Sequence, residues 1–356
     1  MTGIIHVPSR DYTILTPAGI SSLEITVSDR WPEKWDNYSD EARERYEQKV
    51  EEAKNNPKIT DGDTLRVSEY HFQDGNLAVV LDQTSYLWHI ATRNTESRDE
   101  ALPSHLPGGG IHLTTPNDKA NHFSINTLTF VVDKGRVDVL MGVKGKGVEI
   151  GSGQIQLLPA GGADIEDKGP LYTQLREGDE ELFNQGQTLE RAITWQFLNE
   201  LTNQGSIPSK EVELLKKLHP EPQRMSGIEI YSKTFYNQIL GLCGITSFWN
   251  TWLLGAMAID SNIDEIQSIF DCSKDLQKDQ NVLETERIVL LNLDPEDTSK
   301  SQKRIGRYIQ NNFERLRPHA IAGLHFLSDN YQTIMGQIME TYKKRQTARS
   351  NLTLVK

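Results

Sequence analysis

Cysteine is scarce in this chain, and long apolar runs are absent. Only Cys243 and Cys272 occur among the 356 residues, which excludes a disulfide framework and a cysteine-based zinc site. The longest apolar run covers about eight residues within 252–259, whereas a membrane-spanning helix needs about 20. The first residues show no basic segment followed by an apolar stretch, so no signal peptide is predicted. We therefore expect a cytoplasmic protein with reduced thiols and no membrane contact.

Basic residues are also outnumbered by acidic residues. Lysine and arginine number 38 against 50 aspartates and glutamates, which gives a net charge of −12. Because binding to the nucleic-acid backbone requires clustered positive charge, double-stranded nucleic acid is not an expected partner. Hydrophobic residues make up 37% of the chain, and its length suggests two domains or one domain with additions.

The order of the predicted elements indicates a mixed α/β (α+β) fold. Two hairpins are expected where Asp74-Gly75 and Lys134-Gly135 separate runs of alternating apolar residues. Further strands are predicted over 23–27, 154–159, 227–232, 238–244, 248–259 and 287–293. Helices are predicted over 38–56, 188–203 and 262–272, with one or two more over 300–346, and the tail 345–356 is expected to fray. Strands and helices do not alternate regularly, which argues against a doubly wound parallel sheet.

Two segments carry a resemblance to a known family. LPAGG at Leu158–Gly162 is followed by GQTLERAITWQFLNEL at 186–201, and the pair resembles the Nudix superfamily. The Nudix signature is a glycine-initiated loop followed by a helix that reads R-E-x-x-E-E, with alanine three residues before the arginine. Ala192 fits that alanine. With this alignment, the loop before the helix carries an insertion of about twenty residues.

The resemblance implies a fold and a division of the chain. The expected fold is a Nudix-like mixed sheet sandwiched by helices. Residues 1–119 would form a β-rich N-terminal extension with one helix, residues 120–300 the Nudix-like domain, and residues 301–356 a C-terminal helical segment.

In this alignment the chemistry-bearing positions of the helix are mostly replaced. Trp195 stands for the arginine, Gln196 and Asn199 stand for two of the glutamates, and Glu200 alone keeps its charge. In the family these carboxylates hold Mg²⁺ or Mn²⁺, which require oxygen ligands. Each lost charge near such an ion weakens its binding by several kcal/mol at an effective dielectric of about 20. Any metal or catalytic role would fall to Glu200.

The replaced residues favour a catalytically degenerate Nudix protein, which binds a nucleotide-like or phosphorylated ligand or serves in regulation or assembly. No cofactor is then expected, and a homo-oligomer is possible. One alternative is an active Mg²⁺-dependent hydrolase of a nucleoside diphosphate-linked substrate, which uses Glu200 and acids of the preceding loop. These acids are Asp164, Glu166, Asp167, Glu177, Asp179, Glu180 and Glu181, although a solvated acidic surface is the more common role of such a run. A second alternative is a Nudix fold repurposed for a different reaction.

Several residues are candidates for ligand contact. Lys144 and Lys146 lie in the glycine-rich segment GVKGKG, whose backbone N–H groups and basic side chains suit phosphate. The other candidates are Gly161 and Gly162 of LPAGG, together with Trp195, Gln196 and Asn199 of the predicted helix. His105, His112 and His122 match no compact metal motif.

Overall fold

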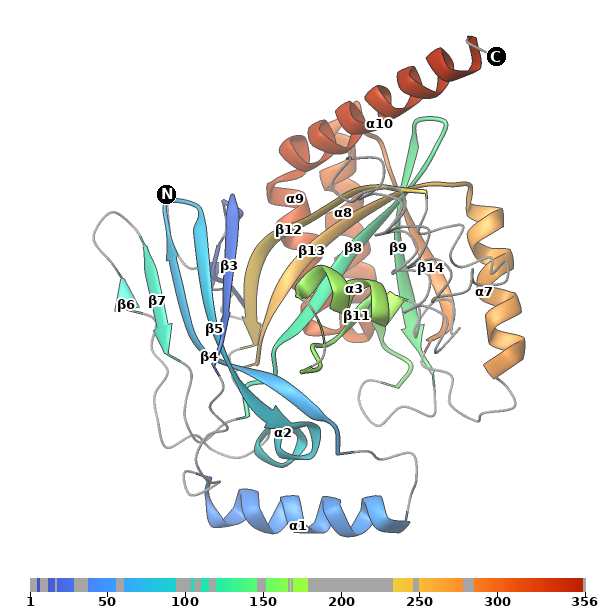
Figure 1. The fold of residues 1–356 in the computed structure, drawn as a ribbon. Helices are drawn as coiled ribbons and strands as arrows, with labels where there is room; N and C mark the ends of the chain where they lie inside the picture. Colours follow the sequence, from blue (N-terminus) through green and yellow to red (C-terminus); the bar gives the residue numbers. More distant parts are fainter. Residues whose placement is uncertain are drawn as a thin grey trace, which may run out of the picture.

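Two β-sheets with helices packed around them make up the described part of the computed structural model (Figure 1). The structure describes residues 5–6, 12–16, 18–28, 38–55, 61–93, 104–105, 110–114, 120–145, 152–165, 167, 169–178, 233–245, 250–277 and 285–354. The protein belongs to the mixed α/β class, as the sequence predicts. The predicted helix 188–203 and the predicted strand 227–232 lie outside the described residues.

The larger sheet has nine strands, in the order β1-β2-β12-β13-β8-β9-β10, with β11 paired to β8 and β14 paired to β9. Its strands are β1 (Ile5–His6), β2 (Thr13–Ile14), β8 (Ser124–Asp133), β9 (Arg136–Lys144), β10 (Ile155–Leu157), β11 (Ala160–Gly162), β12 (Thr234–Ile245), β13 (Asn250–Asp260) and β14 (Thr285–Leu293). The sheet is mixed, because β13 runs parallel to β8 whereas its other pairings are antiparallel.

The smaller sheet has the order β3-β5-β4-β7-β6. Its strands are β3 (Ser22–Val27), β4 (Asp63–Gln73), β5 (Asn76–Ser85), β6 (Ser104–His105) and β7 (Ile111–Thr114). The helices among the described residues are α1 (Asp40–Asn55), α2 (Tyr86–Arg93), α3 (Pro170–Gly178), α7 (Ile263–Gln277), α8 (Thr298–Asn312), α9 (Pro318–Asp329) and α10 (Tyr331–Leu354), with a short 3₁₀ helix, η4 (Phe313–Arg315).

Both predicted hairpins are confirmed. Asp74 and Gly75 join β4 to β5 with φ of 50° and 81°, and Lys134 and Gly135 join β8 to β9 with φ of 49° and 89°. Two successive residues with positive φ form the turn that matches the twist of antiparallel strands. Glycine at the second position adopts this conformation without steric cost.

Helices cover both faces of the larger sheet. On one face, Leu128 and Phe130 of β8 pack in a core with Leu324 of α9 and Ile338 of α10. On the other face, a second cluster joins the sheet to Ile266 of α7. The C-terminal helices therefore complete the core of the sheet. The predicted fraying of the tail is wrong for its first ten residues, because α10 continues to Leu354.

The N-terminal part of the chain contributes to both sheets. β2 pairs with β12, where Ile14 lies opposite Cys243, while β3 to β7 build the smaller sheet. Residues 1–119 are thus not confined to a separate extension. The thiol of Cys243 is buried, as the sequence leads us to expect.

The two sheets meet along the first half of β4. The N–H of Leu65 donates to the carbonyl of Ala163 at 3.1 Å, and the N–H of Phe123 donates to the carbonyl of Leu65 at 2.8 Å. The N–H of Ala163 donates to the carbonyl of Phe123 at 2.9 Å. This junction fixes the chain directly after β11, where the candidate site begins. Within the described part of the chain, no helix is long and apolar enough to span a membrane.

Candidate functional site

The segment LPAGG ends in a short strand, and a helix begins at residue 170. Ala160, Gly161 and Gly162 form β11, which pairs with the start of β8. After a turn, α3 begins at Pro170. Proline suits the first helical position, because an N–H at that position would have no acceptor within the helix. Figure 1 shows α3 lying over β8 and β11. The alignment with residues 186–201 places this stretch in the loop before the predicted helix, whereas residues 170–178 form a helix of their own, α3.

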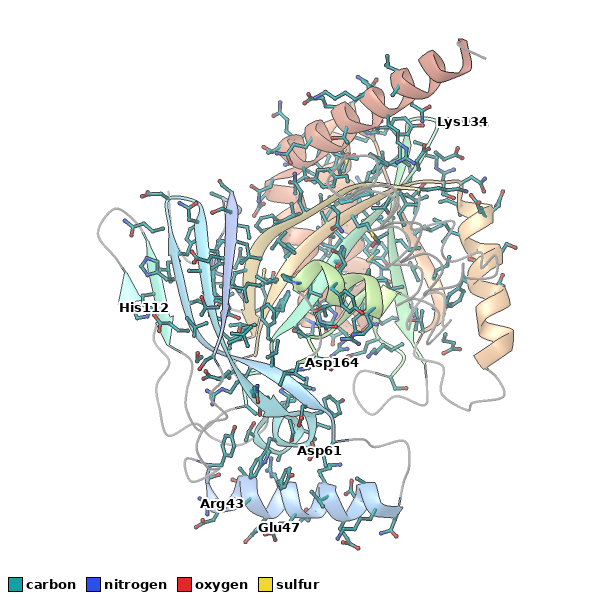
Figure 2. The ribbon with its side chains drawn as sticks, viewed as in Figure 1. Arg43, Glu47, Asp61, His112, Lys134 and Asp164 are labelled. Atoms are coloured by element: carbon teal, nitrogen blue, oxygen red, sulfur yellow. The ribbon has the colours of Figure 1, made fainter. Side chains whose placement is uncertain are left out.

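Arg176 on α3 is the centre of the site. Its Nε and Nη2 donate to the two carboxylate oxygens of Asp167, each at 3.1 Å. Nη1 lies 2.9 Å from Oε1 of Glu177, and Nη2 donates to the carbonyl oxygen of Gly162 at 2.6 Å. Asp164, labelled in Figure 2, has Oδ2 3.6 Å from Nη2. This fork of hydrogen bonds ties α3 to the end of β11 and to the turn between them.

Two of the acids are buried rather than solvated. The side chain of Asp167 is 3% exposed and that of Glu177 is 10% exposed, whereas that of Asp164 is 50% exposed. Asp167 also accepts from the hydroxyl of Thr173 at 2.8 Å. A surface role is therefore wrong for Asp167 and Glu177, and it fits Asp164. Three carboxylates around one guanidinium leave this group with net negative charge, which suits a cation.

The two glycines of LPAGG leave room for neighbouring side chains. The carboxylate of Glu177 occupies the position that a Cβ on Gly161 would take, and the ring of His122 occupies that position at Gly162. Any larger residue would displace these groups. The structure thus gives both glycines a packing role in bringing Glu177 and His122 onto β11.

A buried pair of histidines lies beneath this strand. The rings of His122 and His89 have centroids 4.8 Å apart, and Tyr86 flanks both at 6.3 Å. Burial, and then the nearby charge of Arg176, lower the pKa of His122 to about 4. Burial lowers the pKa of His89 well below its usual value, and the charges of His122 and Arg93 act in the same direction. Both rings are therefore neutral near pH 7.

Arg176 and Glu177 are functional candidates that the sequence interpretation did not align with the signature. Residues 176–181 read R-E-G-D-E-E, which matches R-E-x-x-E-E directly. Thr173 stands three residues before Arg176, where the signature has alanine. Residues 188–203 have the stronger apolar periodicity, whereas residues 176–181 carry the charges of the signature.

The other predicted site residues fall in different places. Lys144 is the last residue of β9 and is half-buried. Lys146, Trp195, Gln196, Asn199 and Glu200 lie outside the described residues, as do Asp179, Glu180 and Glu181. The helix on which the degenerate signature was placed is therefore not part of the described site.

The residues around α3 offer the right ligand type for a hard cation. Magnesium prefers carboxylate oxygens, and Glu177 presents one from the face of α3 that packs on β11. Glu180 and Glu181 follow Glu177 by three and four positions in the sequence and lie outside the described residues. The described residues alone do not form a group of three or more His, Cys, Asp or Glu side chains that could hold a metal ion. A complete ligand set would need Glu180 and Glu181.

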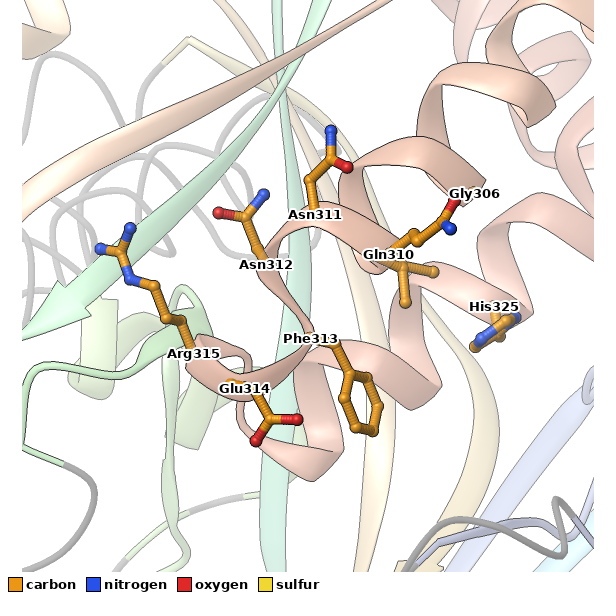
Figure 3. A pocket seen from close by; sticks show the side chains of 9 residues that line it. Gly306, Gln310, Asn311, Asn312, Phe313, Glu314, Arg315 and His325 are labelled. Carbon is orange, nitrogen blue, oxygen red and sulfur yellow. The ribbon is translucent and has the colours of Figure 1, made fainter.

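A separate cavity of about 610 Å³ lies away from α3, between α8, η4 and α9 (Figure 3). Its lining is mixed, with Phe313 and Ile309 beside Gln310, Glu314 and His325. Charges of both signs line this cavity, and we assign it no part in the site at α3.

Comparison with known proteins adds no assignment, because no family model matches the chain and no curated protein matches it.

Proposed function

We propose that the protein is a divalent-metal-dependent hydrolase of the Nudix type, which cleaves a nucleotide-like substrate with a diphosphate linkage at α3. In this proposal Glu177, Glu180 and Glu181 supply the carboxylates, in place of Glu200. The observation that carries the proposal is Arg176, which lies on the helix directly after LPAGG and is paired with Asp167 and Glu177.

The role of Arg176 follows from its contacts. In the Nudix signature the arginine orients the catalytic helix through ion pairs, and Arg176 has the partners for that role. The planar guanidinium holds Asp167 with two donors while a third donor reaches Glu177. The position of Glu177 is thereby set from two sides, by Arg176 and by the backbone of Gly161.

The chemistry needs a cation, a water molecule and a diphosphate. A divalent ion bound by these carboxylates would neutralise phosphate charge and activate the attacking water. Water would add to one phosphorus as the bridging P–O bond breaks, and the proton that the water loses would pass to the leaving phosphate or to solvent. Glu177 would help to hold the ion, Arg176 orients Glu177, and Asp167 holds Arg176.

The test is turnover of nucleoside diphosphate conjugates with Mg²⁺ or Mn²⁺, measured as product release. We expect Glu177→Gln to lower turnover by about 100-fold or more, because a unit charge about 4 Å from another contributes on the order of 4 kcal/mol at an effective dielectric of about 20. Glu47→Gln, at an exposed position of α1, is the matched control and should leave turnover unchanged.

Two outcomes would count against the proposal. Loss of activity in Glu200→Gln but not in Glu177→Gln would place the site in residues 188–203 instead. Saturable binding of the conjugates without metal-dependent turnover by the wild type would support the degenerate, ligand-binding protein instead.

A further inference from the structure

Basic residues from separate parts of the chain meet at the end of β9. The N–H of Lys144 donates to the carbonyl of Gln154 at 2.9 Å, and the N–H of Arg317 donates to the carbonyl of Ile155, also at 2.9 Å. Lys144 and Arg317 therefore lie on either side of the start of β10. Paired segments are about 4.8 Å apart, so the two backbones are separated by roughly 10 Å. Long basic side chains can converge across that distance.

Two buried ring nitrogens lie beside this position without a hydrogen-bond partner in the described part of the chain. They are Nε2 of His319, on the first turn of α9, and Nε1 of Trp252 on β13. The residues are 6% and 1% exposed, and their rings meet edge to face with centroids 6.3 Å apart. Buried polar groups are nearly always satisfied, and an unmade hydrogen bond costs about 1–3 kcal/mol. A ligand or water that accepts hydrogen bonds would remove this cost.

The electrostatic surroundings of His319 are positive. Burial lowers its pKa well below the usual value, and Arg317, Lys144 and Arg93 lower it further. No carboxylate of the described residues is among the groups that shift it. Arg317 also donates to the side chain of Gln156 at 3.2 Å, which holds its guanidinium on β10. In a protein with a net charge of −12, such a gathering of cations marks a place for an anion.

We propose that Lys144, Arg317 and His319 form a phosphate-binding site at the start of α9, distinct from the carboxylate group at α3. Guanidinium, ammonium and imidazole N–H groups donate to phosphate oxygens, and an arginine fork matches their geometry. The site depends on side chains, because the amides of Ala320 and Ile321 already donate to the carbonyl of Arg317. That this phosphate belongs to the hydrolysed substrate rests on the proposed function; the phosphate site itself does not.

The direct test is isothermal titration of the full-length protein with inorganic phosphate, in the presence of a chelator and without added metal. We expect saturable binding by the wild type and roughly tenfold weaker binding by Lys144→Gln and by Arg317→Gln, since each removes a charge-assisted hydrogen bond. Lys300→Gln removes a cation that pairs with Asp294 at the start of α8 and should bind phosphate as the wild type does.

The outcomes separate this proposal from the hydrolase. Glu177→Gln should lose turnover and keep phosphate binding, because its carboxylate is not part of the phosphate site. If Arg317→Gln fails to fold, Lys144→Gln decides alone, since that side chain is half-buried and forms no ion pair within the described part of the chain. Absence of phosphate binding by the wild type, or equal binding by wild type and Lys144→Gln, would overturn the proposal.

Discussion

The ring of His122 occupies the space in which a Cβ on Gly162 would lie, and the carbonyl of the same Gly162 accepts a hydrogen bond from Arg176 at 2.6 Å. Gly162 thus contacts His122 at its α-carbon and Arg176 of α3 through its carbonyl oxygen. We infer that the position of α3 depends on the packing of His122, Gly162 and Arg176.

Gly162→Ala should destabilise the protein by about 1–3 kcal/mol, because the new methyl group must displace a buried ring. The free energy of unfolding from urea denaturation is the measurement. Gly306→Ala is the control: it lies within α8 with no atom near its Cβ position, and it should be neutral or gain up to about 1 kcal/mol. Equal stability of Gly162→Ala and the wild type would show that His122 moves aside without loss.

Arg176→Lys should reduce stability by about 1–3 kcal/mol and impair metal-dependent turnover. A lysine ammonium cannot hold both oxygens of Asp167 while it also reaches Glu177 and the carbonyl of Gly162. Denaturation and turnover should be measured on the same preparation.

The matched control for that change is Arg307→Lys, at an exposed position of α8. It should change the free energy of unfolding by no more than about 0.5 kcal/mol and turnover by no more than about twofold. If Arg176→Lys behaves as this control does, the guanidinium fork does not orient Glu177.

Acid should destabilise the fold through His122. Its pKa is about 4 in the folded protein and 6.5 as the ordinary value, so the unfolded chain binds the extra proton as the pH falls. The free energy of unfolding therefore decreases between about pH 6.5 and pH 4. From pH 7 to pH 5 the expected loss is about 2 kcal/mol, at about 1.4 kcal/mol per pKa unit.

His122→Gln isolates this contribution, because glutamine does not titrate. Its stability should change less between pH 7 and pH 5 than that of the wild type, by about the same 2 kcal/mol. If the free energy of unfolding of His122→Gln falls with pH as steeply as that of the wild type, groups other than His122 cause the loss of stability in acid.

The hairpins and most strands could be predicted from local sequence, because their signals are contained within a few residues. Asp74-Gly75 and Lys134-Gly135 each supply two positive φ values between alternating apolar runs. The start of α1 is also local, since the hydroxyl of Ser39 accepts from the N–H of Ala42 at 3.1 Å.

The site was harder to predict for physical reasons. The face of α3 that packs on β11 buries Thr173, Gln174 and Glu177, which are polar or charged. An apolar periodicity therefore does not mark the face that carries the site. The phosphate site joins residues 144, 317 and 319, and only the pairing of β9, β10 and the start of α9 brings them together.

Tyr70→Phe tests the union of the two sheets, which no local pattern shows. The buried hydroxyl of Tyr70 on β4 lies 2.6 Å from Oγ1 of Thr251 on β13, so one hydrogen bond spans the smaller and larger sheets. Its removal leaves Thr251 buried without this partner, and we expect a loss of about 1–2 kcal/mol in the free energy of unfolding. Tyr308→Phe provides the control, because that buried hydroxyl has no hydrogen-bond partner among the described residues and its loss should be neutral or slightly stabilising. If both variants lose the same stability, the effect belongs to the lost hydroxyl volume, and the hydrogen bond between the sheets contributes nothing of its own.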